Sequence, residues 1–220
     1  SATVLIDYLL EHSVKENWEL VVVDADLKLA QSKVNHSQRA LAVSFDIADD
    51  TERLKFISQA DIVISMLPPA LHFIVAKDCV RQHKNLLTAS YVDESISGLS
   101  AEISRNKLLF LCEMGLDPGI DHMSAMKMID TIRAGGGKVT SFKSHCGGLV
   151  APESDDNPWH YKISWNPRNI IMAGKAGAHY RENGREISIP YEELFTGEHM
   201  VDIPEIGRLS WYPNRDSLSY

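Results

Sequence analysis

The sequence predicts an α/β fold, in which a doubly wound parallel sheet is followed by a second, α+β domain. Short apolar runs alternate with segments of helical periodicity through the first half of the chain, a pattern typical of βαβ units and a parallel sheet. This rhythm changes after about residue 135, where Gly135, Gly136 and Gly137 interrupt a helical segment. We therefore expect two domains, at residues 1–115 and 116–220.

The elements of the first domain follow one another in regular order. Apolar runs predict buried strands at residues 18–23, 42–46, 61–67, 85–89 and 107–112. Between them, apolar residues at the spacing of one helix face predict helices at residues 2–12, 26–36, 49–58, 71–79 and 95–105. The third strand is stopped by Pro68 and Pro69.

A turn at residues 113–122 joins the last of these strands to a further helix. Apolar residues three and four positions apart indicate that helix: Ala125, Met128, Ile129 and Ile132. Asp117 occupies the position of a helix cap and Pro118 that of the first helical residue. Ligands bind open α/β sheets beyond the carboxyl ends of the strands, so Asp117 is either a cap alone or part of a site. Farther along we expect a strand at 138–146 and a helix near 169–180.

The composition argues against several classes of function. The 220 residues carry a net charge of −8 and no basic run, which argues against a nucleic-acid partner. No apolar stretch approaches the roughly 20 residues that a membrane-spanning helix needs. Cys79, Cys112 and Cys146 show no C-x-x-C spacing, and the histidines form no pair at ligand spacing. We therefore expect a cytoplasmic protein without a membrane span or a metal site.

Asp24 indicates a dinucleotide-binding, Rossmann-like sheet. An acidic residue after the second strand of such a sheet hydrogen-bonds the ribose hydroxyls of NAD and repels the 2′-phosphate of NADP. Asp24 follows a helix and a valine-rich run, as this pattern requires, but no G-x-G-x-x-G occurs in the sequence. We therefore expect that the numbered chain lacks the first strand and its glycine loop and binds a dinucleotide poorly. The alternative is that Asp24 is only a solvated residue at a strand end.

Several segments together resemble the saccharopine dehydrogenase family, specifically its glutamate-forming branch. They are residues 88–92, 115–122, 146–153, 157–158, 161–168 and 212–217. The resemblance implies an NAD- or NADP-dependent oxidoreductase of lysine metabolism that interconverts saccharopine with L-glutamate and 2-aminoadipate 6-semialdehyde. It also implies a homodimer formed through the second, substrate-binding domain. The family's proteins are much longer, so both domains are expected to be incomplete in this chain.

The matching positions imply roles for individual residues. The residues expected to contact the substrate are Ser90, Tyr91, Asp117, Cys146 and Arg215. Tyr91, Asp117 and Cys146 form the candidate catalytic set, with Cys146 as a neutral contact rather than a nucleophile. Arg215 would hold a substrate carboxylate in a bidentate ion pair, unless it is a structural arginine paired with an acid. His122 and the substrate's own amine are further candidates for the acid–base group.

The resemblance and the predicted strand ends together imply a set of cofactor contacts. These are Asp24, Asp46, Ile47, Leu67, Pro68, Ser90, Leu116, Asp117, Pro118, Ser164 and Trp165. Asp46 and Ile47 would flank the adenine, and Asp24 favours NAD over NADP. Two other functions stay open: a dehydrogenase of another condensed amino acid, such as a carboxylated polyamine, and a non-catalytic dinucleotide-binding regulator.

Overall fold

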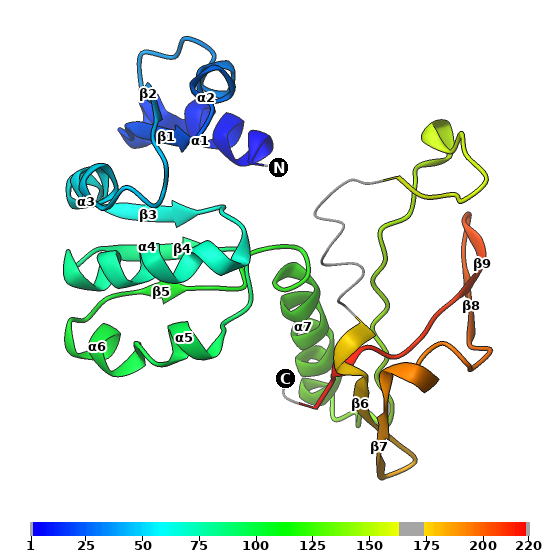
Figure 1. Ribbon diagram of the computed structural model, residues 1–220. Helices are drawn as coiled ribbons and strands as arrows, with labels where there is room; N and C mark the ends of the chain where they lie inside the picture. Colours follow the sequence, from blue (N-terminus) through cyan, green and yellow to red (C-terminus); the bar gives the residue numbers. More distant parts are fainter. Residues whose placement is uncertain (1, 163–173, 219–220) are drawn as a thin grey trace. The chain divides into compact units, whose positions relative to one another are not determined.

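The computed structural model describes residues 2–162 and 174–218 (Figure 1). The chain forms two compact units, Ser1–Thr140 and Ser141–Tyr220. The first unit contains the alternating strands and helices and extends through the helix that follows the 113–122 turn. The second unit contains short strands and single turns of 3₁₀ helix.

The predicted alternation of helices and strands in the first unit is confirmed, with boundaries that shift by a few residues. The elements are α1 (Thr3–Glu16), β1 (Leu20–Asp24), α2 (Leu27–Val34), β2 (Ala40–Ser44), α3 (Asp50–Gln59), β3 (Ile62–Ser65), α4 (Pro69–Arg81), β4 (Asn85–Thr88), α5 (Glu94–Ser97), α6 (Ser100–Arg105), β5 (Phe110–Leu111) and α7 (Ile120–Ala134). The single helix expected at 95–105 is two short helices. The chain closes α5 at Gly98, whose N–H donates to the carbonyl of Glu94.

Aspartates set the starts of three helices. Asp26, Asp49 and Asp93 each accept backbone N–H groups from the first turn of the helix that follows, α2, α3 and α5 respectively. Such caps satisfy donors that have no partner within the helix, and each stabilises its helix by about 1 kcal/mol. The local sequence therefore fixes where these helices begin.

The strands of the first unit form two parallel ladders (Figure 1). β1 pairs with β2, and β4 lies between β3 and β5. Among the described residues no ladder joins the two groups. The break falls where the order typical of dinucleotide-binding sheets, 3-2-1-4-5-6, places a strand that precedes α1. The expectation that the strands are buried is wrong for β1, β2 and β3, where Val21, Leu41 and Ile62 are 50%, 55% and 55% exposed.

The core of the first unit lies where α3, α4 and α5 meet the second ladder. Its buried members are Ile57, Val75, Ala76, Cys79, Leu86 and Ile96. The Cys79 thiol is fully buried, and this burial, together with the nearby Asp78 carboxylate, raises its pKa to about 12. Cys79 is therefore a packing residue of the core and stays protonated.

The turn before α7 differs from its prediction. The helix begins at Ile120 after Gly119, so neither Asp117 caps it nor is Pro118 its first residue. The Asp117–Pro118 peptide is cis, and Gly119 has a φ of 146°. A Cβ on Gly119 would collide with the backbone of Gly115 and Glu113, so this turn requires glycine. Asp117 therefore lies outside the first turn of α7, and its carboxylate can make other contacts.

The second unit is built from two small sheets. Its elements are η1 (Pro152–Ser154), η2 (Gly174–Ala176), β6 (Ala178–Glu182), β7 (Arg185–Ile189), η3 (Tyr191–Glu193), β8 (Met200–Ile203), β9 (Gly207–Ser210) and β10 (Arg215–Asp216). β6 pairs with antiparallel β7 and parallel β10, and β8 pairs with antiparallel β9. Asn183 and Gly184 both have positive φ in the β6–β7 turn, as expected of an Asn-Gly hairpin.

Two predictions for this part of the chain are wrong. Residues 138–146 belong to no ladder in the part of the chain that the structure describes, although their composition suits a strand. The helix expected near 169–180 is replaced over its described residues by η2 and the start of β6, and residues 169–173 lie outside the described part. A strand needs a partner to satisfy its backbone groups, which local composition does not reveal.

Candidate active site

The loops that follow β4 and β5 are joined by backbone hydrogen bonds. The N–H of Met114 donates to the carbonyl of Thr88 over 3.1 Å, and the N–H of Glu113 donates to that of Ser90 over 3.0 Å. Both loops begin at the carboxyl ends of parallel strands, which is where open α/β sheets bind ligands. We take these loops as the candidate site.

Two residues predicted to be catalytic meet at this place. The Tyr91 hydroxyl, from the loop after β4, donates to Oδ1 of Asp117, from the turn before α7, over 2.7 Å. A hydrogen bond to an ionised carboxylate is shorter and stronger than one between neutral groups. The pair lies in an exposed position that a ligand can reach, beside Leu116, which is 68% exposed. Pro118, in contrast, is buried.

Ser90, the third predicted residue of these loops, is hydrogen-bonded to the buried side chain of His72. The Nε2 atom of His72 lies 2.8 Å from the Ser90 hydroxyl, and Nδ1 lies 2.8 Å from the Ser65 hydroxyl. His72 is 2% exposed, and burial lowers its pKa against the opposing effect of the Asp93 carboxylate. The sequence analysis did not single out His72; its place just after Pro68 and Pro69 was the available signal.

His122 is engaged by its neighbour. Its Nδ1 atom lies 2.8 Å from Oδ1 of Asp121, which also accepts the N–H of Gly119 over 3.0 Å. Burial tends to raise the pKa of Asp121, but hydrogen bonds from the backbone of His122 and Gly119 and from the His122 ring together lower it. This contact orients the His122 ring within the turn, and its role as an acid–base group stays a prediction.

The predicted ribose contact, Asp24, lies at the end of β1. Its Oδ1 atom accepts the N–H of Asp26 over 2.9 Å, and the side chain is partly exposed. The Ser44 hydroxyl at the end of β2 donates to the carbonyl of Ala25 over 2.9 Å, which joins the two strand ends. An acid at this strand end fits a ribose diol, so the arrangement is compatible with a dinucleotide.

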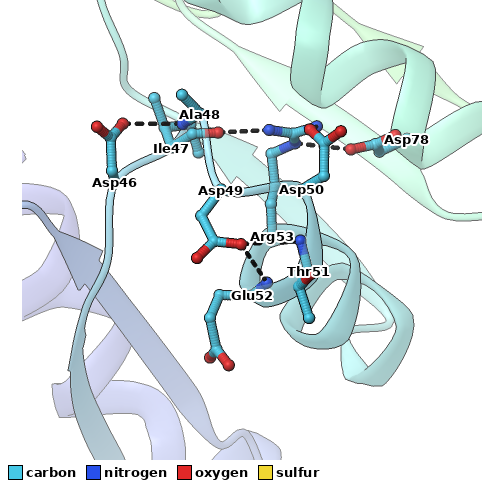
Figure 2. Close-up of polar contacts among 9 residues, drawn as sticks. All are labelled: Asp46, Ile47, Ala48, Asp49, Asp50, Thr51, Glu52, Arg53 and Asp78. Carbon is cyan, nitrogen blue, oxygen red and sulfur yellow. Dashed lines mark hydrogen bonds and ion pairs between the residues drawn. The ribbon is translucent and has the colours of Figure 1, made fainter.

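The predicted adenine contacts, Asp46 and Ile47, lie in a loop that Arg53 braces (Figure 2). The Asp46 carboxylate accepts a hydrogen bond from the N–H of Ala48 over 2.9 Å. The carbonyl of Ile47 accepts a hydrogen bond from Nη1 of Arg53 over 2.5 Å. The Ile47 side chain also packs against the hydrophobic core. The conformation of this loop is therefore set by its own hydrogen bonds and by contacts with Arg53 and the hydrophobic core.

Arg53 holds this loop through a buried ion pair. Its Nε atom lies 2.6 Å from Oδ2 of Asp78, and the two side chains are 7% and 12% exposed. Its Nη2 atom lies 2.6 Å from Oδ1 of Asp50, whose side chain is 79% exposed. Burial opposes the charge of Arg53, but hydrogen bonds and charge from both acids outweigh this and raise its pKa. Figure 2 shows the guanidinium between the loop and Asp78. The sequence analysis did not identify Arg53 because its buried partner, Asp78, lies on another helix.

The positions of the remaining predicted contact residues say little about ligand binding. Leu67 packs against the core, and Pro68 directly precedes α4 in the loop after β3. Cys146 and Arg215 belong to the second unit, so their contact with a substrate stays a prediction. Ser164 and Trp165 lie outside the described residues.

Neither a metal site nor a membrane span is found in the described residues. These residues contain no group of three or more His, Cys, Asp or Glu side chains that could hold a metal ion. Over the same residues, every helix is too short or too polar to cross a membrane.

The parallel strands, the acid at the end of β1 and the polar loops beyond β4 and β5 have the architecture typical of the dinucleotide-binding class of proteins. Comparison with family models gives a more specific result. Residues 2–111 match the saccharopine dehydrogenase NADP binding domain, and residues 115–220 match the saccharopine dehydrogenase C-terminal domain. The chain belongs to the saccharopine dehydrogenase family.

Individual relatives agree with this assignment. The chain is 42% identical to alpha-aminoadipic semialdehyde synthase of Arabidopsis thaliana over 208 residues, which is 94% of this chain and 20% of the relative. It is 39% identical to saccharopine dehydrogenase [NADP(+), L-glutamate-forming] of Saccharomyces cerevisiae, over 81% of this chain and 40% of the relative. The solved apo saccharopine dehydrogenase (L-Glu forming) from S. cerevisiae superposes with a TM-score of 0.86 at 36% identity, covering 98% of this chain and 48% of that structure. The chain thus spans half or less of the length of these relatives.

Proposed function

We propose that the protein interconverts saccharopine with L-glutamate and 2-aminoadipate 6-semialdehyde, using a nicotinamide dinucleotide. The observation that carries the proposal is the 2.7 Å hydrogen bond between Tyr91 and Asp117 at the carboxyl ends of β4 and β5. The resemblance to the family implies that both residues face the substrate. The yeast relative is named for the L-glutamate-forming reaction, which supports the proposal by relationship.

Few protein groups are needed for this reaction. A bound nicotinamide supplies the hydride acceptor for the carbon on the lysine side of the substrate amine. The secondary ammonium of saccharopine must first lose a proton, and the Asp117 carboxylate can accept its hydrogen bond while Tyr91 holds that carboxylate in place. Water then hydrolyses the resulting imine to L-glutamate and the semialdehyde, and one proton is released. Orientation of the amine is therefore the main task of this pair.

The three carboxylates of saccharopine require cations within a protein of net charge −8. Arg215 is the proposed bidentate partner of one of them, and Cys146 is proposed as a neutral contact of the substrate. Both residues are in the second unit and within residues 115–220, which match the saccharopine dehydrogenase C-terminal domain. A homodimer formed through that domain is part of the same proposal.

The choice between NAD and NADP has opposing support. The family model and the fungal relatives carry NADP in their names, so relationship favours NADP. The NAD preference rests on Asp24, an acid at the end of β1, because an acid at this position of a dinucleotide-binding sheet repels a 2′-phosphate. A cytoplasmic location also stays a prediction, because the mouse relative is named as mitochondrial.

The test is saccharopine-dependent reduction of NAD and of NADP by the protein in its full natural length, with release of L-glutamate measured directly. Tyr91→Phe should lower kcat/KM by about 10–150-fold, the loss of a hydrogen bond to a charged group. Tyr8→Phe, at a tyrosine of α1 that is 54% exposed, is the matched control and should change little. Absence of turnover with both cofactors refutes the function, and an active Tyr91→Phe refutes the role of the pair.

A further inference from the structure

His72 is a buried polar side chain that the proposed reaction does not use. It lies in the first turns of α4 and is 2% exposed. Its ring joins two strand ends, because Ser65 is the last residue of β3 and Ser90 follows β4. Thr88 adds a longer contact of 3.4 Å to Nε2. Both ring nitrogens are therefore engaged by hydroxyl groups.

We propose that His72 is a positioning residue that orients the Ser90 hydroxyl toward the carboxamide of the bound nicotinamide. The inference rests on the proposed function and adds a residue to it. It concerns the hydrogen bond between Nε2 and Ser90, whereas Nδ1 contacts Ser65 on the opposite side of the ring.

The contact between His72 and Ser90 favours this positioning role over a role that only links β3 to β4. Ser65 and Thr88 are buried at 4% and 1% exposure, and contacts to these two would already join β3 to β4. Ser90 lies beyond the end of β4, is only half-buried and precedes Tyr91 of the candidate pair. The hydrogen bond from His72 thus links a buried side chain to a partly exposed residue of the candidate site.

The backbone of Ser90 is fixed as well. Its N–H donates to the Thr88 hydroxyl over 3.3 Å, and its carbonyl accepts the N–H of Glu113 over 3.0 Å. With the backbone held at both groups, rotation about χ1 is the main remaining freedom of Ser90, and His72 removes it. Preorganised groups of this kind lower the entropy lost when a ligand binds.

The chemistry of a neutral imidazole suits this task. A neutral ring has one N–H donor and one acceptor nitrogen, and the Ser65 hydroxyl can complement either tautomer. When Nε2 accepts, Ser90 keeps its oxygen lone pairs for a ligand N–H; when Nε2 donates, Ser90 keeps its own O–H for a ligand oxygen. A carboxamide offers both groups, so either state leaves Ser90 one useful bond. Burial lowers the pKa of His72, which keeps the ring neutral near pH 7.

Two amide variants separate the two sides of the ring. In His72→Gln the amide nitrogen or oxygen stands near the place of Nε2 and can still reach Ser90, whereas in His72→Asn it stands near Nδ1 and reaches only Ser65. Both variants keep a buried amide, so they disturb the core similarly. Ser65→Ala, which leaves the Ser90 side intact, is a further control.

The experiment uses the protein in its full natural length and measures the dissociation constant of the reduced dinucleotide by its fluorescence, together with kcat/KM for saccharopine. His72→Asn should weaken dinucleotide binding about 2–12-fold, the loss of one hydrogen bond, and lower kcat/KM by about 10–100-fold through misplacement of the reacting groups. His72→Gln and Ser65→Ala should stay within about threefold of the unaltered protein in both measurements. Adding Ser90→Ala to His72→Asn should bring no further loss, because both changes remove the same interaction.

Equal losses in His72→Asn and His72→Gln at equal thermal stability would overturn the inference, and so would a further large loss on adding Ser90→Ala. Failure of the proposed function is distinguishable, because then the unaltered protein would bind the reduced dinucleotide without turning over saccharopine. The binding series alone would still test His72 in that case.

Discussion

Replacing Arg53 with methionine should destabilise the protein by about 3–5 kcal/mol, the usual effect of removing one partner of a buried ion pair. Most of this loss of stability comes from Asp78. Its side chain is 12% exposed, and its carboxylate would lose the guanidinium that lies 2.6 Å away. The contact with Asp50 adds only about 0–1 kcal/mol, because that side chain is 79% exposed and solvent screens the pair. The carbonyl of Ile47 would also lose its donor.

Urea and thermal unfolding of the chain measure this change. At about 2–4 °C per kcal/mol for a chain of this size, Arg53→Met should lower Tm by about 6–20 °C. Asp50→Asn is the control and should change the free energy of unfolding by less than about 1 kcal/mol. The double variant Arg53→Met with Asp78→Leu should be more stable than Arg53→Met alone, because no buried charge is left unpaired. A loss below about 1 kcal/mol in Arg53→Met, or a double variant less stable than the single one, would refute the reasoning.

Two further predictions follow from shifted pKa values. Burial lowers the pKa of His72, with Asp93 opposing, so the folded state binds fewer protons than the unfolded chain. The stability that this group contributes is complete above about pH 6.5 and is lost as the pH falls below it; His72→Gln should flatten that acid limb in urea unfolding, and an unchanged slope would contradict the assignment. Burial raises the pKa of Cys79 to about 12, so its thiol should resist alkylation at pH 8 until urea unfolds the protein, and rapid native labelling would show this to be wrong.

Much of the first unit could be predicted because its signals are local. Apolar runs and helical spacing identified every strand from β1 to β5. Placement of Ser90, Tyr91 and Asp117 near one another also follows from local information, since all three come after parallel strands whose carboxyl ends share one edge. The family resemblance then named these residues as site candidates.

Contacts between distant segments could not be predicted in the same way. Arg53 meets Asp78 from another helix, and His72 meets Ser90 from another strand end. The turn at Asp117 was misjudged because its geometry depends on the backbone of Gly119, which leaves no room for a side chain beside Gly115. The strand expected at 138–146 failed for a related reason, because apolar composition does not supply a pairing partner.

The sequence by itself determined the order of strands and helices in the first unit, because periodicity acts over a few residues. Its motifs also indicated the family to which the chain is similar. Only the tertiary structure decided which side chains support the candidate site. Asp117 turned from a cap into the acceptor of Tyr91, and His72 and Arg53 became the buried supports of two binding loops. Burial makes such polar contacts necessary, since a buried polar group must find a partner wherever the fold provides one.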